Sequence, residues 1–224
     1  MRAVSRRFDR FVDDLSRVEL SSRACNQFAR TGAEADRNAI RRRNLRLYLD
    51  ELDAIGPRLL LVGEAVSHRG GRLTGIAFVS ESVMLAGVEL VSGTRVLGED
   101  RGYRKADLST PRSTEASATM VWGTIRNIDP LPILWNAFPF HPFVAGNPFS
   151  NRIPTPDELR IGERFVRRLI DLFGISRIAA IGNQASLTLT RLEVEHDKVR
   201  HPSQGGKTKF VAGMEAISRA HNRR

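Results

Sequence analysis

Two polar loops, far apart in the sequence, contain the residue types best suited to chemistry. The first runs from Gly63 to Phe78, reads GEAVSHRGGRLTGIAF and follows the apolar run Leu59 to Val62. It combines a carboxylate at Glu64 with basic side chains and with glycines, which let a backbone approach a ligand closely. The positive charge suits a phosphate-bearing ligand, whereas the alternative is a surface loop whose arginines are only solvated.

The second loop begins at His201 and reads HPSQGG. Its proline fixes the turn, and the small residues that follow leave backbone N–H groups accessible. Histidine is a common general acid, general base or electrophile, although a lone histidine can also simply cap a strand. This loop can therefore present an imidazole and several N–H donors to one ligand.

Alternating apolar and helical patterns predict the elements that position these loops. Strands are predicted at 58–62, 131–135, 177–181 and 193–200, and region 88–111 is predicted to be a long excursion with short elements at most. The strand and helix order predicts a three-layer α/β/α domain with a central, mainly parallel four-stranded sheet. Helices are predicted at 6–18, 36–54, 116–126, 155–173, 183–192 and 207–220.

Four residues stand at the carboxyl ends of the predicted strands: Glu64, Asn136, Gly182 and His201. Ligands of open parallel sheets bind outside these ends. One crevice is therefore expected to collect a carboxylate, an amide, a tight turn and an imidazole. This convergence predicts an active site at that edge of the sheet.

The 224 residues, 41% of them hydrophobic, are enough for one substantial core, so a single domain is expected. It divides into N-terminal helices at 1–56, a catalytic core at 57–210 and a C-terminal helix at 211–224. Lys and Arg number 35 against 25 Asp and Glu, with short basic runs only at 41–43 and 223–224. The net charge favours nucleic acid as the partner, although it can also serve solubility alone.

The single cysteine, Cys25, excludes an intrachain disulfide and any iron–sulfur cluster held by several cysteines of this chain. The five histidines lack the paired spacing of a zinc site, so neither a metal nor another cofactor is expected. The charged segment 1–14 does not resemble a signal peptide, and no apolar run has transmembrane length. These features predict a cytoplasmic protein without membrane contact, and we expect a monomer.

Taken in order, the motifs resemble those of the uracil-DNA glycosylase superfamily. The first loop resembles its GxDPYH or GEAPG segment followed by G-x-x-F at 75–78, and the second loop resembles its HPS motif. Between them LLLVGEA, ILWNAF, NRIPTPDEL and IAAIGNQA follow the spacing of the superfamily core, so the resemblance covers 59–210. It implies the fold of that superfamily and an enzyme that flips uracil out of single- or double-stranded DNA. Hydrolysis of the N-glycosidic bond would leave an abasic site, without any cofactor.

The resemblance also implies roles for individual residues. Phe78 would stack on the flipped base and Asn136 would read its Watson–Crick edge, with Ala65 beside them in the base pocket. His201 would donate a hydrogen bond to uracil O2 as charge develops on the leaving base. The alternatives are a core phenylalanine, a turn-capping asparagine and a strand-capping histidine. The implied DNA contacts, among which Gln204 is the candidate wedge, are His68, Arg69, Ser203, Gln204, Gly205, Gly206 and Lys207.

Two positions depart from the superfamily pattern. When GEAVSH is aligned with GxDPYH, Ala65 replaces the water-activating aspartate and Ser67 replaces the aromatic residue that excludes thymine. Alanine cannot polarise water, so Glu64 is expected to position the water and stabilise the cationic sugar, as its counterpart does in the GEAPG branch, with His68 as the second candidate. That branch holds an iron–sulfur cluster with four cysteines. This chain therefore resembles a divergent branch without the cluster.

Two other functions stay open at this stage. A nucleotide or phosphoester hydrolase that used the Glu64 crevice would need a metal, and its activity would depend on magnesium or manganese. A non-catalytic protein that binds uracil or abasic DNA would retain DNA stoichiometrically and release no free base. Loss of the aromatic screen also leaves room for thymine or other altered bases as substrates.

Overall fold

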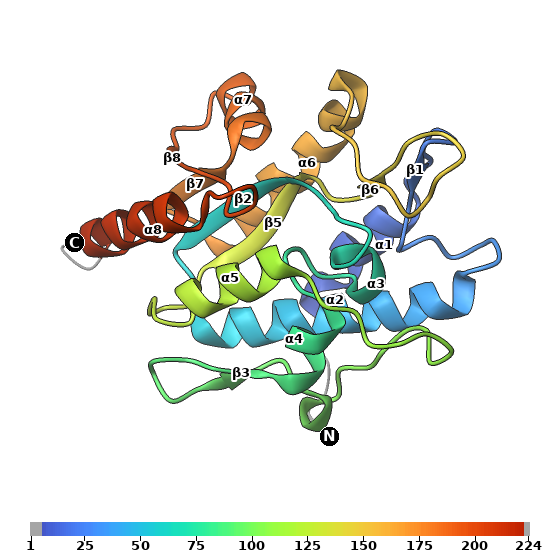
Figure 1. The fold of residues 1–224 in the computed structure, drawn as a ribbon, viewed down its shortest axis with the longest axis horizontal. Coiled ribbons are helices and arrows are strands. Elements are labelled where there is room, and N and C mark those ends of the chain that lie inside the picture. The colour runs from blue at the N-terminus through green and yellow to red at the C-terminus, as the bar shows by residue number, and fades with distance from the viewer. Residues whose placement is uncertain (1–5, 222–224) are drawn as a thin grey trace.

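A four-stranded parallel sheet lies at the centre of the structure, a computed structural model that describes residues 6–221 (Figure 1). Its strand order is β5–β2–β7–β8, with β2 at Leu59–Ala65, β5 at Ile133–Phe138, β7 at Arg177–Ile181 and β8 at Asp197–Val199. All six residues of β5 and the first five of β2 are buried. Continuous burial is typical of a parallel sheet covered on both faces, so the predicted sheet is confirmed.

Helices flank this sheet, in the predicted α/β/α arrangement. α6 packs on β5, α7 packs on β7 and β2, and α8 contacts both β8 and α5. In Figure 1, α5 and α8 lie in front of the sheet and α6 lies behind it. The helices are α1 (Asp9–Ser16), α2 (Ala35–Ile55), α3 (Gly71–Thr74), α4 (Glu81–Ala86), α5 (Ala116–Ile125), α6 (Pro156–Phe173), α7 (Asn183–Arg191) and α8 (Lys207–His221), with 3₁₀ turns η1 (Arg6–Phe8) and η2 (Glu99–Arg101).

The start of α6 follows directly from its sequence. The Thr155 hydroxyl accepts the N–H of Glu158 at 3.3 Å, and the Glu158 carboxylate accepts the N–H of Thr155 at 2.8 Å. This reciprocal capping box, with proline in the first turn, fixes the helix start that the sequence predicted. α6 then passes close to β5 at Gly162, where a Cβ would lie 1.8 Å from the carbonyl oxygen of Ala137.

α2 covers the free edge of β5. The buried Tyr48 hydroxyl accepts the N–H of Leu134 on that strand at 3.0 Å. Three residues further along α2, Glu51 accepts hydrogen bonds from Tyr103 at 2.9 Å and from the N–H of Leu97 at 3.0 Å. These contacts hold the 88–111 excursion, whose short elements were predicted: a hairpin of β3 (Val88–Glu89) with β4 (Arg95–Val96), followed by η2.

Two of the three arginines of the basic run at 41–43 are buried. Arg41 and Arg42 are buried, and their guanidinium groups bind Glu34 at 2.6 Å and the carbonyl of Phe28 at 2.7 Å. Arg43 donates to the carbonyl of Gly102 at 2.8 Å. These three arginines therefore join helix α2 to its neighbours, while the run at 223–224 lies outside the described residues.

Three strands differ from their predicted ranges. β2 and β5 continue to Ala65 and Phe138, so Glu64 and Asn136 lie within strands. β8 is shorter than the predicted 193–200, because Glu193 has a φ of 54° and the chain still turns there. The small antiparallel pair of β1 (Ala24–Cys25) and β6 (His141–Pro142) lies beside the main sheet. None of the described helices combines the length and apolar character needed to span a membrane.

Candidate active site

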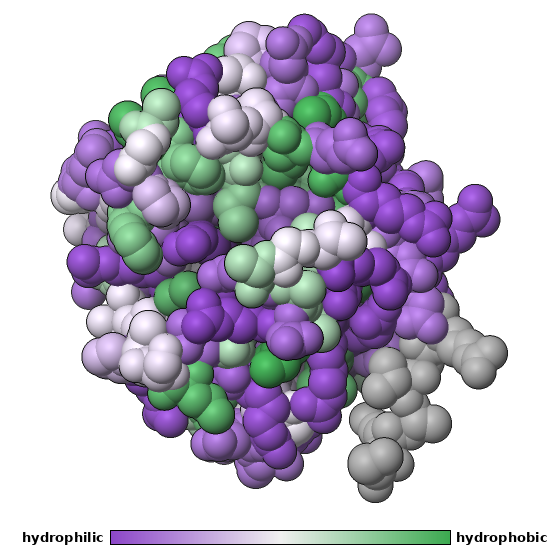
Figure 2. Space-filling view, turned by 90° about the vertical axis from the view of Figure 1, so that its right-hand side faces the viewer, coloured by the Kyte–Doolittle hydropathy of each residue, from purple (hydrophilic) through white to green (hydrophobic). Residues whose placement is uncertain are grey.

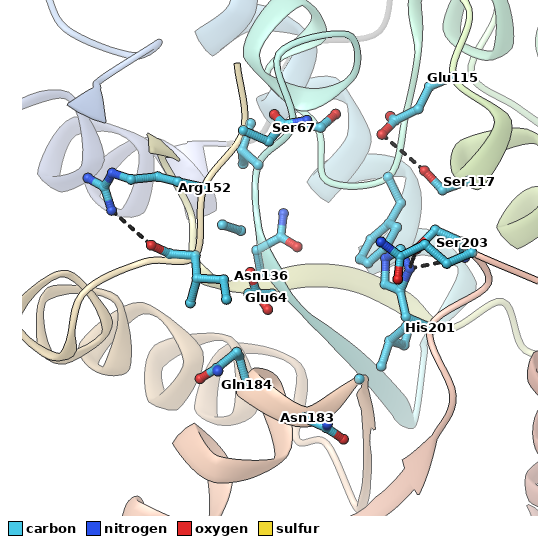
Figure 3. A pocket seen from close by; sticks show the side chains of 18 of the residues that line it. Glu64, Ser67, Glu115, Ser117, Asn136, Arg152, Asn183, Gln184, His201 and Ser203 are labelled. Atoms are coloured by element: carbon cyan, nitrogen blue, oxygen red, sulfur yellow. Dashed lines mark hydrogen bonds between the residues drawn. The ribbon is translucent and has the colours of Figure 1, made fainter. Parts of the chain in front are cut away.

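A pocket of about 630 Å³ lies at the carboxyl ends of β2, β5 and β7. Figure 3 shows Glu64 and Asn136 near the centre of the view, with His201 to their right. The convergence expected from the strand ends is therefore present in the structure. From the predicted set, the pocket lining includes Glu64, Ala65, Phe78, Asn136, His201, Ser203 and Gln204.

The pocket floor depends on a glycine. Gly63 of β2 pairs in register with Asn136 of β5. A Cβ at Gly63 would lie 2.2 Å from the ring of Phe78 and 2.7 Å from Oδ1 of Asn136. Real Cβ atoms essentially never make contacts this short, so glycine is required for the ring and the carboxamide to approach the strand together.

Phe78 has an unusual backbone conformation for its residue type. Its φ is 55°, in the left-handed region that costs a non-glycine residue about 1–3 kcal/mol. The indole Nε1 of Trp122 donates to the Phe78 carbonyl at 3.1 Å and helps to hold this conformation. The phenyl ring lies 6.2 Å from the His201 ring, tilted by 36°, so an aromatic face is fixed at the side of the pocket.

Asn136 is 2% exposed and its Oδ1 has no hydrogen-bond partner within the described chain. A buried acceptor without a partner costs about 1–3 kcal/mol. A ligand that brings an N–H donor to this position would remove that cost. The floor of the pocket is therefore built to accept a hydrogen bond from a ligand.

The imidazole of His201 is oriented by the second polar loop. Its Nδ1 accepts the backbone N–H of Ser203 at 3.2 Å and lies 2.7 Å from the Ser203 hydroxyl. Because a backbone N–H can only donate, Nδ1 is an acceptor and the proton of the neutral ring resides on Nε2. Burial, together with the charge of Arg200, lowers the pKa of His201 and favours this neutral form. Nε2–H is then free to donate to a ligand.

Glu64 is half-buried near the end of β2, and burial raises the pKa of its carboxyl group. No side chain or backbone group of residues 6–221 forms a hydrogen bond with this carboxylate. It is therefore available to a water molecule or to a positively charged reaction centre. Ala65, the next residue, is half-buried and adds a methyl group to the lining.

A neighbouring groove of about 520 Å³ brings together most of the predicted DNA contacts. His68 is held there by Asn151, whose Oδ1 accepts the His68 N–H at 3.0 Å. The lining of this groove includes His68, Arg69, Ser203, Gln204, Gly205 and Lys207.

Gly206 has a different environment from the other residues of its loop. It is buried, and its N–H donates to the Ser203 carbonyl at 3.0 Å. A Cβ there would lie 2.0 Å from the carbonyl oxygen of His201. Gly206 therefore shapes the loop that orients His201, and a direct contact of Gly206 with DNA stays a prediction.

The pocket also contains residues to which the motifs assigned no role. Asn183 and Gln184 begin α7 directly after Gly182, whose φ of 93° turns the chain out of β7. A helix N-terminus presents unpaired N–H groups and favours anions, so the strand–Gly–helix pattern was the available signal. Other lining residues that had no predicted role are Glu115, Ser117, Asn151, Arg152 and Ile153, the last three at the start of the NRIPTPDEL motif.

The described residues contain no group of three or more His, Cys, Asp and Glu side chains placed to hold a metal ion. The polar character of the pocket comes instead from single groups on different elements. Two of them are carboxylates, Glu64 on β2 and Glu115 before α5, and Glu115 accepts the hydroxyl hydrogen bond of Ser117 at 3.0 Å.

No family model and no curated protein matches this sequence. Its structure is similar to the crystal structure of wild-type SMUG2 from Pedobacter heparinus, with a TM-score of 0.64 and 13% sequence identity. The match covers 97% of this chain and 99% of that chain, and SMUG2 is a member of the uracil-DNA glycosylase superfamily. The resemblance in fold inferred from the motifs is thus confirmed: the chain has the fold of the uracil-DNA glycosylase superfamily.

Proposed function

We propose that the protein is a DNA glycosylase that removes uracil by hydrolysing its N-glycosidic bond and leaves an abasic site. The observation that carries the proposal is the buried, unpartnered Oδ1 of Asn136, which lies next to the ring of Phe78 in the pocket that His201 also lines. A planar ligand with one N–H donor between two acceptors fits these groups. Uracil, with N3–H between O2 and O4, has that pattern.

Base recognition follows from the same contacts. Oδ1 of Asn136 accepts uracil N3–H, and its Nδ2 donates to O4. The fixed ring of Phe78 stacks on the base once it leaves the helix, a contact worth about 1–3 kcal/mol per base. Cytosine presents an amino donor at position 4 and an acceptor at N3, so it reverses both hydrogen bonds and is rejected.

Catalysis depends on stabilising the charges that develop as the N-glycosidic bond breaks. The C1′–N1 bond breaks first, its electron pair goes to uracil, and the Nε2–H of His201 stabilises the negative charge at O2. Glu64 stabilises the cationic sugar and orients a water molecule. Water oxygen then bonds to C1′, and its proton passes to Glu64 and on to solvent or the uracil anion. Ala65 takes no part in proton transfer, and His68 remains the second candidate for the water.

The DNA backbone is held at the rim of the pocket. Arg69, Arg200 and Lys207 line the pocket or its neighbouring groove, and none of them forms an ion pair with a described residue. The N-terminus of α7 adds backbone N–H donors at Asn183. These groups suit the phosphates on either side of a flipped nucleotide.

The test uses an end-labelled oligonucleotide with one uracil, incubated in EDTA and then treated with alkali. We expect cleavage at the uracil, reduced about a hundredfold to a thousandfold in His201→Ala. Asn136→Asp is expected to lose activity comparably, because a carboxylate cannot donate to O4. Asn127→Asp, a change of the same kind outside this pocket, should retain full activity.

Other results would identify a different function. Cleavage that required magnesium or manganese would indicate a metal-dependent hydrolase. An intact strand that stays bound to the protein in a one-to-one complex would indicate a non-catalytic binder. Parallel substrates with thymine or another altered base in place of uracil would define the base range left open by Ser67.

A further inference from the structure

The loop that carries Gln204 has no large apolar side chain to replace a flipped base in the DNA stack. Gln204 is exposed at a φ of 51°, and Gly205 and Gly206 follow it. Enzymes and architectural proteins that open a base stack commonly insert an apolar wedge such as Ile, Leu or Phe. An exposed apolar side chain elsewhere in the pocket lining could take this part.

The apolar rim, Phe149 and Ile153, lies on the segment between β6 and α6. Ile153 lines the pocket and is 60% exposed, and Phe149 is 70% exposed. Figure 2 shows hydrophobic side chains in small groups among hydrophilic ones on the face that lies on the right in Figure 1. Exposure of single apolar side chains is common, so what distinguishes Ile153 is its place in the pocket lining and its firmly held backbone.

The backbone next to Ile153 is firmly held. The Arg152 guanidinium binds the Glu158 carboxylate with two hydrogen bonds, of 2.7 and 2.6 Å, and donates to the Ile153 carbonyl at 3.0 Å. Glu158 in turn caps the start of α6 at Thr155. Ile153 is also β-branched and loses little side-chain freedom when it is inserted between bases. The side chain is thus presented on a preorganised support.

Phe149 is tied to the first polar loop. The guanidinium of Arg72 lies 5.7 Å from the centre of the Phe149 ring, and Asn151 binds the N–H of His68 at 3.0 Å. These contacts connect the apolar rim to the loop that carries Glu64. The ring face that Arg72 does not cover stays open to solvent.

We infer that Ile153, supported by Phe149, is the wedge that enters the DNA base stack and fills the space left by the flipped base. This inference rests on the proposed function. It assigns the wedge to the segment before α6 instead of the Gln204 loop, and the cations that line the pocket and its neighbouring groove would hold the DNA strand beside it.

The decisive experiment compares two duplexes. In one, uracil faces adenine; in the other, it faces a pyrene nucleotide, which itself fills the gap when uracil leaves the stack. We expect Ile153→Ala to lower excision at least tenfold on the first duplex and to approach the wild-type rate, within threefold, on the second. Leu187→Ala, which truncates a side chain 58% exposed on α7 and outside the pocket, should match wild type on both.

Equal losses on both duplexes, or no loss on either, would overturn the assignment. The assignment would also be overturned if the pyrene duplex restored excision by Gln204→Ala but not by Ile153→Ala. That result would place the wedge in the HPS loop. Binding to a duplex with an abasic analogue beside 2-aminopurine gives a readout independent of excision: wild type should raise the fluorescence and Ile153→Ala should not. A wild-type chain that neither excises uracil nor prefers the abasic duplex would instead contradict the proposed function, and the wedge with it.

Discussion

The floor and the rim of the pocket are built in different ways. On the floor, Gly63, Phe78 and Asn136 contact one another within a buried layer at the ends of β2 and β5, and each position depends on the others. On the rim, Arg69 and Lys207 are exposed and form no ion pair with described residues. The side chains of the floor fit together in only one arrangement, whereas the rim presents several separate cations that can each contact an anionic strand.

The difference indicates how selectivity and affinity are divided between the two regions. Hydrogen bonding and stacking on the floor act at short range in a buried setting, so displacement by a fraction of an ångström is costly. Attraction between rim cations and phosphates acts at longer range, is screened by salt and adds over many contacts. Base choice should therefore depend on the floor, and retention of DNA on the rim.

The largest effect is expected from Gly63→Ala. The new methyl group would displace both the Phe78 ring and the Asn136 carboxamide, which a Cβ would meet at 2.2 and 2.7 Å. Because base stacking and hydrogen bonding are lost together, we expect excision to fall about a thousandfold. Single-turnover kinetics on the uracil duplex measures this, and thermal unfolding reports the cost of overpacking.

Gly123→Ala is the matched control. Gly123 lies within α5, and a Cβ there would have no neighbour within 4 Å. Alanine should stabilise the helix by about 0.5–1 kcal/mol and leave excision unchanged. Comparable activity in the two variants would show that the floor is more tolerant than its contacts indicate.

An intermediate effect is expected from Glu64→Gln. Loss of the carboxylate removes stabilisation of the cationic sugar and orientation of the water, so kcat should fall about a hundredfold. In the wild-type enzyme the acid limb of the pH–rate profile should lie above the ordinary carboxyl pKa of 4.5, because burial raises the pKa of Glu64. The limb should disappear in Glu64→Gln, and its persistence would point to His68.

The same variant makes a separate prediction for stability. The folded protein holds the Glu64 proton to a higher pH than the unfolded chain, so this group favours folding below pH 4.5 and ceases to do so as pH rises through its raised folded pKa. Glu64→Gln should therefore unfold at a higher temperature than wild type at pH 7. The difference should vanish when both proteins are unfolded in acid below pH 4.5.

The smallest effect is expected on the rim. Lys207→Ala should leave kcat on saturating DNA unchanged and weaken binding about threefold at moderate salt. It should also lower the slope of log K against log salt by about one, as for one lost phosphate contact. Titration of a labelled duplex at several salt concentrations tests this. A change in kcat would show that Lys207 takes part in the chemical step and does not only bind phosphate.

The sequence predicted the sheet well because its strands are continuous apolar runs and because α6 carries a full capping box. Glu64, Asn136 and His201 could be placed together because parallel strands deliver their carboxyl ends to one edge. The exact strand ends were harder to predict from the sequence, since the backbone at Glu193 depends on tertiary contacts rather than on its residue type.

Long-range packing was beyond what residue types could indicate. The arginines at 41–43 are a basic run in the sequence, yet two of them are buried against Glu34 and Phe28. No motif assigned a role to Phe149 or Ile153, and only the fold places Ile153 in the pocket lining. In both cases the partner lies on a different element of the structure.

The left-handed backbone of Phe78 has a consequence for substitution at this position. Glycine adopts that conformation without cost, but replacing the phenylalanine would also remove a ring that packs against the core. The replacement would also remove the stacking face. The fold thus tolerates a strained backbone because the same residue supplies both a packed ring and an aromatic face that is in place before any ligand binds.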